Sequence, residues 1–304
     1  MLEPTAAPHA ESRFIAAPDG LSLHVRCYGE AAMTSHLPVL CLPGLTRTEA
    51  DFEALARRLS EDAVHPRRVF ALDSRGRGRS DYDRDWRNYN LAVELGDVIA
   101  AVAALGLDRA IFVGTSRGGL LTMLLAAAQP MAIAGAVLND IGPVVEPAGL
   151  LRIKGYVGST PQPRDFPDAV DILRELFGAQ FPNLGAADWL AWAHRSWRAG
   201  ADGLVATYDT AIAETLKDVD PNEPMPALWE PFDALAPVPT LVIRGTLSDI
   251  LSIETVCAMR ERRGDLEAIE VSGQGHAPLL AEAPILAQIA DFILRCDRAQ
   301  QADR

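Results

Sequence analysis

The first half of the chain alternates short apolar runs with longer amphipathic stretches. Residues 38–42 (PVLCL) form a fully apolar run, which is typical of a strand buried in a parallel sheet. Residues 49–59 place apolar side chains on one face at helical spacing. Because such stretches alternate, the pattern predicts a parallel sheet with helices on both faces. The expected strands are 21–28, 38–42, 68–72, 110–113 and 133–138, and the expected helices are 49–59, 90–105 and 117–128.

The pattern changes after about residue 143. Proline becomes frequent, strand-like runs vanish and aromatic residues concentrate as far as residue 230. Helical spacing persists, so we predict a helical cap inserted into the sheet. The cap is expected at residues 143–233, with helices at 168–177, 187–199 and 203–214. It divides an α/β core into two parts, residues 1–142 and 234–304. The second part is expected to contain strands 239–245 and 266–271 and a helix at 285–295.

Composition narrows the classes of partner and compartment. The net charge of −13 disfavours nucleic acid and anionic membranes, which attract basic surfaces. The chain has no apolar run long enough for a membrane helix, and residues 1–14 are predicted to be a short disordered tail without a secretory signal. The four cysteines lack metal-ligand spacing. We expect a cytoplasmic protein, either a monomer or a homodimer.

The residues Gly114-Thr115-Ser116-Arg117-Gly118 match the pattern G-x-S-x-G. They follow the apolar run AIFV and precede the helical stretch GLLTMLLAAA, which is the setting of a nucleophile elbow. The glycines let the strand and the helix pass closely, and the helix N-terminus favours negative charge beside Ser116. We therefore predict Ser116 as a catalytic nucleophile. A serine that merely caps a helix is the structural alternative.

A serine hydroxyl needs a base to remove its proton, and histidine suits this task because it titrates near neutral pH. Of the six histidines, His276 lies in a glycine-containing loop, GQGHAP, between an expected strand and the last expected helix. That loop leaves the sheet at the same edge as Ser116, because both follow the carboxyl ends of strands. We therefore predict His276 as the base.

Two aspartates are candidates for the acid that fixes the tautomer of His276. Asp249 follows the strand 239–245 in the turn TLSD, and the chain order serine, aspartate, histidine is known for such sets on α/β sheets. Asp140 follows the preceding expected strand and emerges at the same edge, but an aspartate there also suits a local turn. We predict Asp249 as the acid and keep Asp140 as the alternative.

Acyl transfer also needs hydrogen-bond donors for the oxyanion. The backbone N–H of Arg117, directly after the nucleophile, is one candidate. The backbone N–H of Leu45, in the loop PGLTR after the strand 38–42, is the other.

The loop 73–81 (DSRGRGRSD) is rich in glycine and arginine. It lacks the spacing of either common phosphate-binding loop. We therefore predict a structural turn whose arginines pair with nearby carboxylates.

The aromatic residues of the cap indicate an apolar or aromatic portion of a substrate. Tryptophans that only pack the cap onto the core would give the same pattern. The candidates for substrate contact are Trp189, Trp192, His194 and Tyr208.

Together these segments resemble the α/β-hydrolase superfamily. The likeness covers residues 14–142 and 235–294 and rests on LPGLTRT, DSRGRGRSD, GTSRGG, RGTLSD and GQGHAP. It implies an α/β-hydrolase fold with a variable cap and a reaction that needs no metal or organic cofactor. Many relatives have His-Gly where this chain has Pro43-Gly44. Haloalkane dehalogenases and typical epoxide hydrolases have an aspartate at the position of Ser116, which argues against these two activities.

Three functions remain open from the sequence. The resemblance favours a serine hydrolase that cleaves a carboxylic ester or lactone through an acyl-enzyme. A carbon–carbon bond hydrolase of a diketone-like substrate is the alternative within the same family. A non-catalytic ligand-binding protein on this scaffold is the third, and the intact set of serine, acid and histidine argues against it.

Overall fold

The computed structural model describes residues 10–29, 35–220 and 225–302. Its centre is an eight-stranded sheet with the order β1-β2-β4-β3-β5-β6-β9-β10. β2 pairs antiparallel with β1 and β4, and the remaining neighbours are parallel, which confirms the predicted mostly parallel sheet. The strands are β1 (Glu11–Ala16), β2 (Ser22–Tyr28), β3 (Val39–Leu42), β4 (Val69–Leu72), β5 (Ala110–Thr115), β6 (Ile133–Asn139), β9 (Thr240–Gly245) and β10 (Glu267–Val271).

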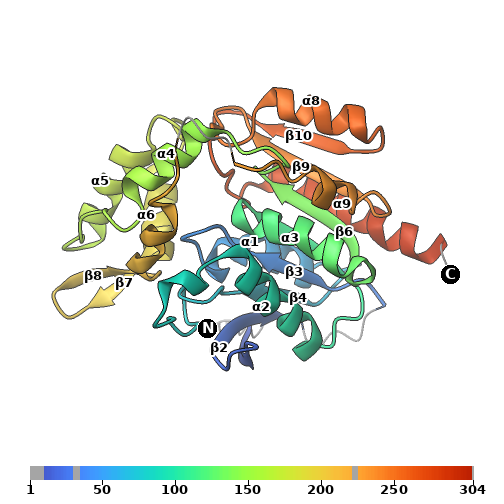
Figure 1. Cartoon of the computed structure of the whole chain (residues 1–304), viewed down its shortest axis with the longest axis horizontal. Helices are drawn as coiled ribbons and strands as arrows, with labels where there is room; N and C mark the ends of the chain where they lie inside the picture. The colour runs from blue at the N-terminus through green and yellow to red at the C-terminus, as the bar shows by residue number, and fades with distance from the viewer. Residues whose placement is uncertain (1–9, 30–34, 221–224, 303–304) are drawn as a thin grey trace, which may run out of the picture.

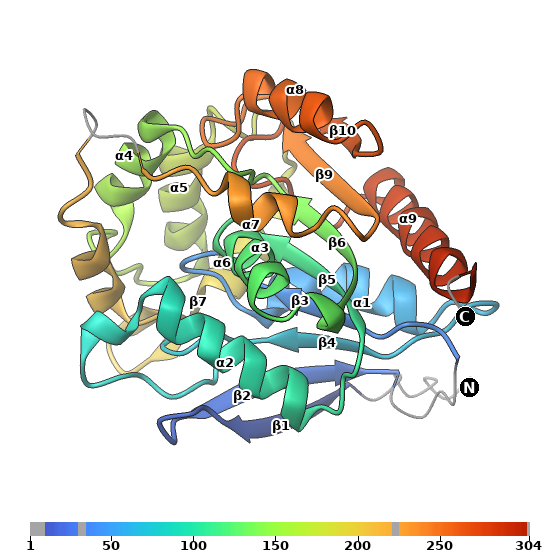
Figure 2. The ribbon, with the colours of Figure 1, turned by 45° about the vertical axis from the view of Figure 1, so that its right-hand side comes forward.

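Helices cover both faces of this sheet (Figures 1 and 2). The buried side chains of α1 and α9 belong to one apolar cluster, and those of α2, α3 and α8 belong to the other, on the opposite face. This arrangement confirms the predicted α/β layers. The core helices are α1 (Glu53–Ser60), α2 (Leu91–Ala104), α3 (Arg117–Ala128), α8 (Ile253–Arg262) and α9 (Ala283–Ala302).

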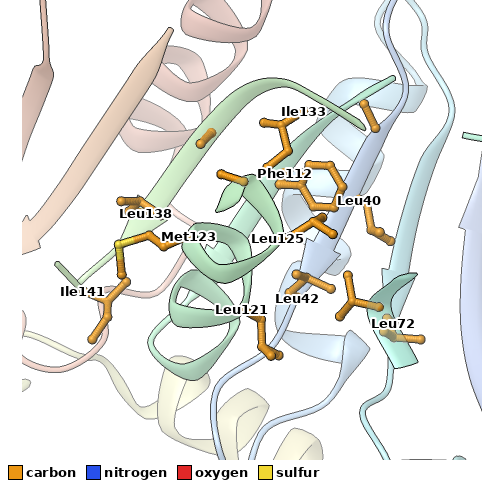
Figure 3. Packing of buried hydrophobic residues seen from close by; sticks show 14 of the residues in the cluster. Leu40, Leu42, Leu72, Phe112, Leu121, Met123, Leu125, Ile133, Leu138 and Ile141 are labelled. Atoms are coloured by element: carbon orange, nitrogen blue, oxygen red, sulfur yellow. The ribbon is translucent and has the colours of Figure 1, made fainter. Parts of the chain in front are cut away.

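Helix α3 packs directly on the centre of the sheet. Figure 3 shows Leu121 and Leu125 of this helix among the side chains of the strands, including Leu42 and Phe112. The helix approaches closely because a Cβ atom at Gly118 would overlap the carbonyl of Leu42. The glycine therefore sets the distance between helix and sheet at the point where β5 turns into α3.

The chain between β6 and β9 contains the cap, which we define as residues 143–233. Most of its elements lie together beyond one end of the sheet (Figures 1 and 2). A separate apolar cluster, rich in tryptophan and phenylalanine, holds α5 and α6 to the β7–β8 hairpin. The cap elements are α4 (Pro147–Tyr156), α5 (Phe166–Phe177), α6 (Ala186–Ser196), β7 (Trp197–Gly200), β8 (Gly203–Ala206), a 3-10 helix (Thr210–Leu216) and α7 (Trp229–Asp233).

Two expectations from the sequence are wrong. The helix expected at 203–214 is instead β8 followed by a 3-10 helix, because residues 203–206 pair with β7 and Gly203 has a φ of +129°. Residues 11–14 of the expected disordered tail instead belong to β1 on the edge of the sheet, whereas residues 1–9 of that tail lie outside the described residues. No helix within the described ranges is long and apolar enough to cross a membrane.

Candidate active site

Ser116 lies at the sharp turn between β5 and α3. Its backbone has φ 52° and ψ −116°, a region that residues with a side chain rarely adopt. A Cβ at Gly114 would overlap the backbone of Gly118, so both glycines are needed for the turn. Strain of this kind costs about 1–3 kcal/mol and persists where the surrounding structure enforces it. The turn places Ser116 at the carboxyl edge of the sheet, as the sequence predicts.

His276 joins Ser116 to a carboxylate. Its Nε2 lies 2.7 Å from Ser116 Oγ, and its Nδ1 lies 2.8 Å from Oδ2 of Asp140. The Asp140 carboxylate is fully buried and also accepts hydrogen bonds from the backbone N–H of Gly245 at 2.8 Å and the hydroxyl of Ser248 at 2.6 Å. An acceptor at Nδ1 keeps the proton there and leaves Nε2 free to accept the serine proton.

Asp249, predicted to orient His276, is not hydrogen-bonded to it. Its two oxygens accept hydrogen bonds from Arg152 of α4, at 2.6 and 2.9 Å. Burial opposes ionisation of Asp249, but the bonds from Arg152 outweigh this effect and lower its pKa. Asp140 takes the place beside His276 because it follows β6 in a left-handed conformation with φ 57°, held by Ser248 from the next loop. The carboxylate within hydrogen-bonding distance of His276 is thus Asp140, the alternative from the sequence, and not Asp249.

A cavity of about 890 Å³ lies between this trio and the cap. Ser116 and His276 line it from the core. Among the cap residues predicted to contact substrate, Trp192, His194 and Tyr208 line it as well. Trp189 does not line it but stacks behind Trp192, with ring centroids 5.5 Å apart. No three His, Cys, Asp or Glu side chains in the described ranges gather closely enough to hold a metal ion.

The two residues predicted to supply oxyanion donors are tied to one buried carboxylate. Arg77 donates from Nε to the carbonyl of Leu45 at 2.8 Å and from Nη1 to Glu94 at 2.7 Å. Arg117 donates from Nε to the other oxygen of Glu94 at 2.5 Å. Leu45 lines the cavity, and Arg117 begins α3. Glu94 therefore fixes the segments that carry both candidate N–H groups.

The loop 73–81 forms the predicted turn. The Arg75 guanidinium binds Asp97 through two hydrogen bonds of 2.6 Å and also binds Asp83 at 2.8 Å. The turn also holds the cap, because the backbone N–H of Gly78 donates to the carbonyl of Thr207 at 2.7 Å. The arginine-rich segment is thus a support between core and cap.

A group of charged residues in the cavity wall was not predicted from the sequence. Arg47, from the loop after β3, donates two hydrogen bonds to Asp51 at 2.5 and 2.6 Å. Arg195, from α6 of the cap, donates to the same carboxylate at 3.0 Å. We call these three residues the arginine cluster. The i,i+4 spacing of Arg47 and Asp51 is visible in the sequence, but the arrival of Arg195 depends on how the cap packs.

The comparisons with known proteins agree with this architecture. Residues 39–288 match the alpha/beta hydrolase family. The chain belongs to this family. A crystal structure of an alpha/beta hydrolase from Novosphingobium aromaticivorans DSM 12444 has 43% sequence identity and a TM-score of 0.87, over 95% of this chain and 100% of that one. The resemblance inferred from the sequence motifs is therefore confirmed.

Curated relatives of this hydrolase include enzymes with different substrates. The 3-hydroxybutyrate-oligomer hydrolase of Cupriavidus necator is 33% identical over 278 residues, which cover 89% of this chain and 93% of that protein. The 2-(acetamidomethylene)succinate hydrolase of Mesorhizobium japonicum is 26% identical over 257 residues, which cover 84% of this chain and 85% of that protein.

Proposed function

We propose that this hydrolase cleaves a carboxylic ester through Ser116, His276 and Asp140. The proposal depends on one observation, the continuous chain of hydrogen bonds from the Ser116 hydroxyl through His276 to Asp140, of 2.7 and 2.8 Å. A serine, a base within hydrogen-bonding reach and a third group that orients the base are the parts of an activated nucleophile. Ser116 and His276 lie in the wall of a cavity large enough for a small organic substrate, with Asp140 buried behind His276.

In the proposed reaction, Ser116 Oγ attacks the ester carbonyl carbon while its proton passes to His276 Nε2. Asp140 stabilises the resulting imidazolium through Nδ1–H. His276 then returns the proton to the departing alkoxide, which leaves as an alcohol, and Ser116 carries the acyl group. A water molecule, deprotonated by His276, then attacks the carbonyl carbon of this acyl-enzyme. The bond to Ser116 Oγ breaks, His276 returns the proton to this oxygen, and the carboxylic acid leaves.

The negative oxygen that develops during attack needs donors. The backbone N–H of Arg117 is suited to this role because it follows the nucleophile at the N-terminus of α3, where the helix dipole also favours negative charge. The backbone N–H of Leu45 is the second proposed donor, since its loop runs beside Ser116. A Cβ placed at the neighbouring Gly44 would lie 3.7 Å from that of Ser116.

For the substrate class, we propose short esters of hydroxy acids. The 33% identity to a 3-hydroxybutyrate-oligomer hydrolase over most of both chains supports this choice. The cavity wall combines apolar side chains such as Trp192 and Leu176 with a few polar groups, which suits a small ester with a charged end. Lactones and diketone-like substrates, the alternatives from the family resemblance, belong in the same screen.

The test compares the wild type with Ser116→Ala. We expect the wild type to hydrolyse p-nitrophenyl esters of short acids and linear 3-hydroxybutyrate dimers, and to react covalently with a fluorophosphonate probe. Ser116→Ala should lose both properties while its thermal unfolding stays cooperative. A wild type that neither hydrolyses any ester nor reacts with the probe would favour the ligand-binding alternative. Turnover of diketones but not esters would favour carbon–carbon cleavage.

A further inference from the structure

The cavity carries an excess of positive charge although the chain as a whole is acidic. The chain has a net charge of −13. Histidines aside, the side chains of the cavity wall that are charged at neutral pH are Arg47, Asp51, Glu53, Arg57 and Arg195. Glu53 and Arg57 pair with each other at 3.0 Å. The arginine cluster therefore holds two guanidinium groups against one carboxylate, which leaves one positive charge unbalanced.

The charge state of the cluster is well defined. Burial opposes ionisation of Asp51, but the charges of Arg47 and Arg195 outweigh it and lower the pKa of this aspartate. Burial, and to a smaller extent the charge of Arg47, lower the pKa of Arg195 against the opposing pull of Asp51. An arginine stays protonated throughout the working range of proteins. A second anion beside Arg195 would therefore interact with a guanidinium whose positive charge Asp51 only partly neutralises.

Hydrogen-bond donors of the cluster are available to a ligand. Arg195 uses Nε for Asp51, and its two terminal nitrogens donate to no other residue among those described. Each of the three side chains remains about a fifth exposed, and all three line the cavity. Arg47 is held in place by Ser196, which accepts from Nη1 at 3.1 Å, and by the ring of Trp192, 5.3 Å from its guanidinium carbon. The donors are therefore preorganised, as a binding site for an anion requires.

The arginine cluster lines the same cavity as the nucleophile. A Cβ placed at Gly44 would lie 3.7 Å from Cβ of Ser116 and 3.3 Å from Cγ of Arg47. The loop that carries Arg47 therefore passes beside Ser116. Because Ser116, Arg47 and Arg195 line the same cavity, a substrate in this cavity can contact both the nucleophile and the guanidinium groups.

We propose that Arg195 and Arg47 bind a carboxylate carried by the substrate, so that this hydrolase prefers esters with a free carboxylate over their neutral analogues. The inference rests on the proposed ester hydrolysis and narrows its substrate class. Arginine is suited to this task because its planar guanidinium matches the geometry of a carboxylate. Asp51 acts as the anchor that aims both guanidinium groups, and it does not touch the substrate.

The test uses two p-nitrophenyl esters of glutaric acid, p-nitrophenyl hydrogen glutarate with a free carboxylate and p-nitrophenyl methyl glutarate, in which a methyl ester removes this charge, and follows the release of p-nitrophenol above the rate without enzyme. We expect the wild type to have the higher kcat/KM for the anionic ester. Arg195→Gln should lower kcat/KM for the anionic ester by about 10- to 100-fold, mainly through KM, which is the range of a hydrogen bond to a charged group. The same change should alter the neutral ester less than about threefold.

Arg57→Gln is the matched control. Arg57 also lines the cavity, but it is paired with Glu53 at 3.0 Å and Glu61 at 3.2 Å, so its loss should not change the preference. If Arg195→Gln unfolds, the wild type provides a second measurement. Butyrate should inhibit hydrolysis of the neutral ester competitively, more strongly than neutral butyramide does and less strongly as salt is added.

The outcomes separate this inference from the proposed function. Hydrolysis of both esters through Ser116 with no preference for the anion, and equal inhibition by butyrate and butyramide, would overturn the carboxylate site and leave ester hydrolysis intact. Failure to hydrolyse either ester would count against the function instead. The site is then judged by whether butyrate raises the thermal unfolding midpoint of the wild type but not of Arg195→Gln.

Discussion

Replacing Asp140 by asparagine distinguishes the two candidate acids. Oδ2 of Asp140 accepts from both His276 and Ser248, and Oδ1 accepts from the backbone N–H of Gly245. An asparagine whose NH₂ faces His276 would drive the imidazole proton to Nε2, the atom that must accept from Ser116. The opposite orientation would place the NH₂ against the N–H of Gly245. This second orientation keeps an oxygen toward His276 but sets two donors against each other, so the first orientation is favoured and we expect kcat to fall by about 10³- to 10⁴-fold.

Asp249→Asn is the matched comparison. Asp249 and Arg152 form an ion pair whose side chains are 28% and 23% exposed. Partly exposed pairs of this kind contribute about 1 kcal/mol or less to stability. Because Asp249 is hydrogen-bonded to Arg152 and not to His276, we expect kcat to fall by less than about fivefold.

The assay for both variants is the steady-state hydrolysis of a short p-nitrophenyl ester, with the rate of fluorophosphonate labelling as a readout that needs no known substrate. Thermal unfolding shows whether each variant is folded. A loss of activity in Asp249→Asn that exceeds the loss in Asp140→Asn would refute the assignment of Asp140.

Two further predictions concern stability. Gly118→Ala should destabilise the fold by at least about 1–3 kcal/mol, because its Cβ would overlap the Leu42 carbonyl. Gly155→Ala, which has open space around it, should stabilise the fold by about 0.5 kcal/mol. Thermal unfolding measures both effects. Burial, aided by the charge of Asp73, raises the pKa of Glu49 to about 7, so the folded protein keeps a proton that the unfolded chain releases near pH 4.5. As the pH rises from about 4.5 to 7, the free energy of unfolding of the wild type should therefore fall by about 1–3 kcal/mol more than that of Glu49→Gln. Denaturant titrations at both pH values measure this difference, and equal losses in the two proteins would contradict the prediction.

The sheet and two members of the candidate triad could be predicted from local patterns. The expected strands are all present, with their ends shifted by no more than two residues. Ser116 and His276 each follow a strand that ends at the same edge, and parallel strands bring such positions together regardless of their distance along the chain. The alternation of strands and helices in the sequence therefore already predicts that Ser116 and His276 lie close together.

The acid could not be chosen in this way. Asp140 and Asp249 follow β6 and β9, which are neighbours in the sheet, so topology brings both carboxylates near His276. The choice between them depends on one backbone angle at Asp140 and on the partner that each aspartate finds, Ser248 or Arg152. Such contacts between distant loops leave no periodic signal in the sequence.

The cap was predicted less well for a similar reason. Residues 203–206 are expected to begin a helix and residues 197–199 to end one, but the two segments pair as the strands β8 and β7. Pairing of this kind depends on which segments meet in space, so the pattern of one segment does not reveal it. The burial of Trp189 behind Trp192, rather than in the cavity wall, likewise depends on the packing of α5 against α6.

The link through Glu94 affects how this cavity can be redesigned. Through Arg77 and Arg117 it joins the loop of Leu45 to the start of α3, two places that a protein engineer would treat as independent. Both segments depend on Glu94, so the effects of substitutions in the two segments on turnover should not be additive. Combinatorial libraries that vary both segments together, with residue 94 held constant, should recover more active variants than those that vary one segment at a time.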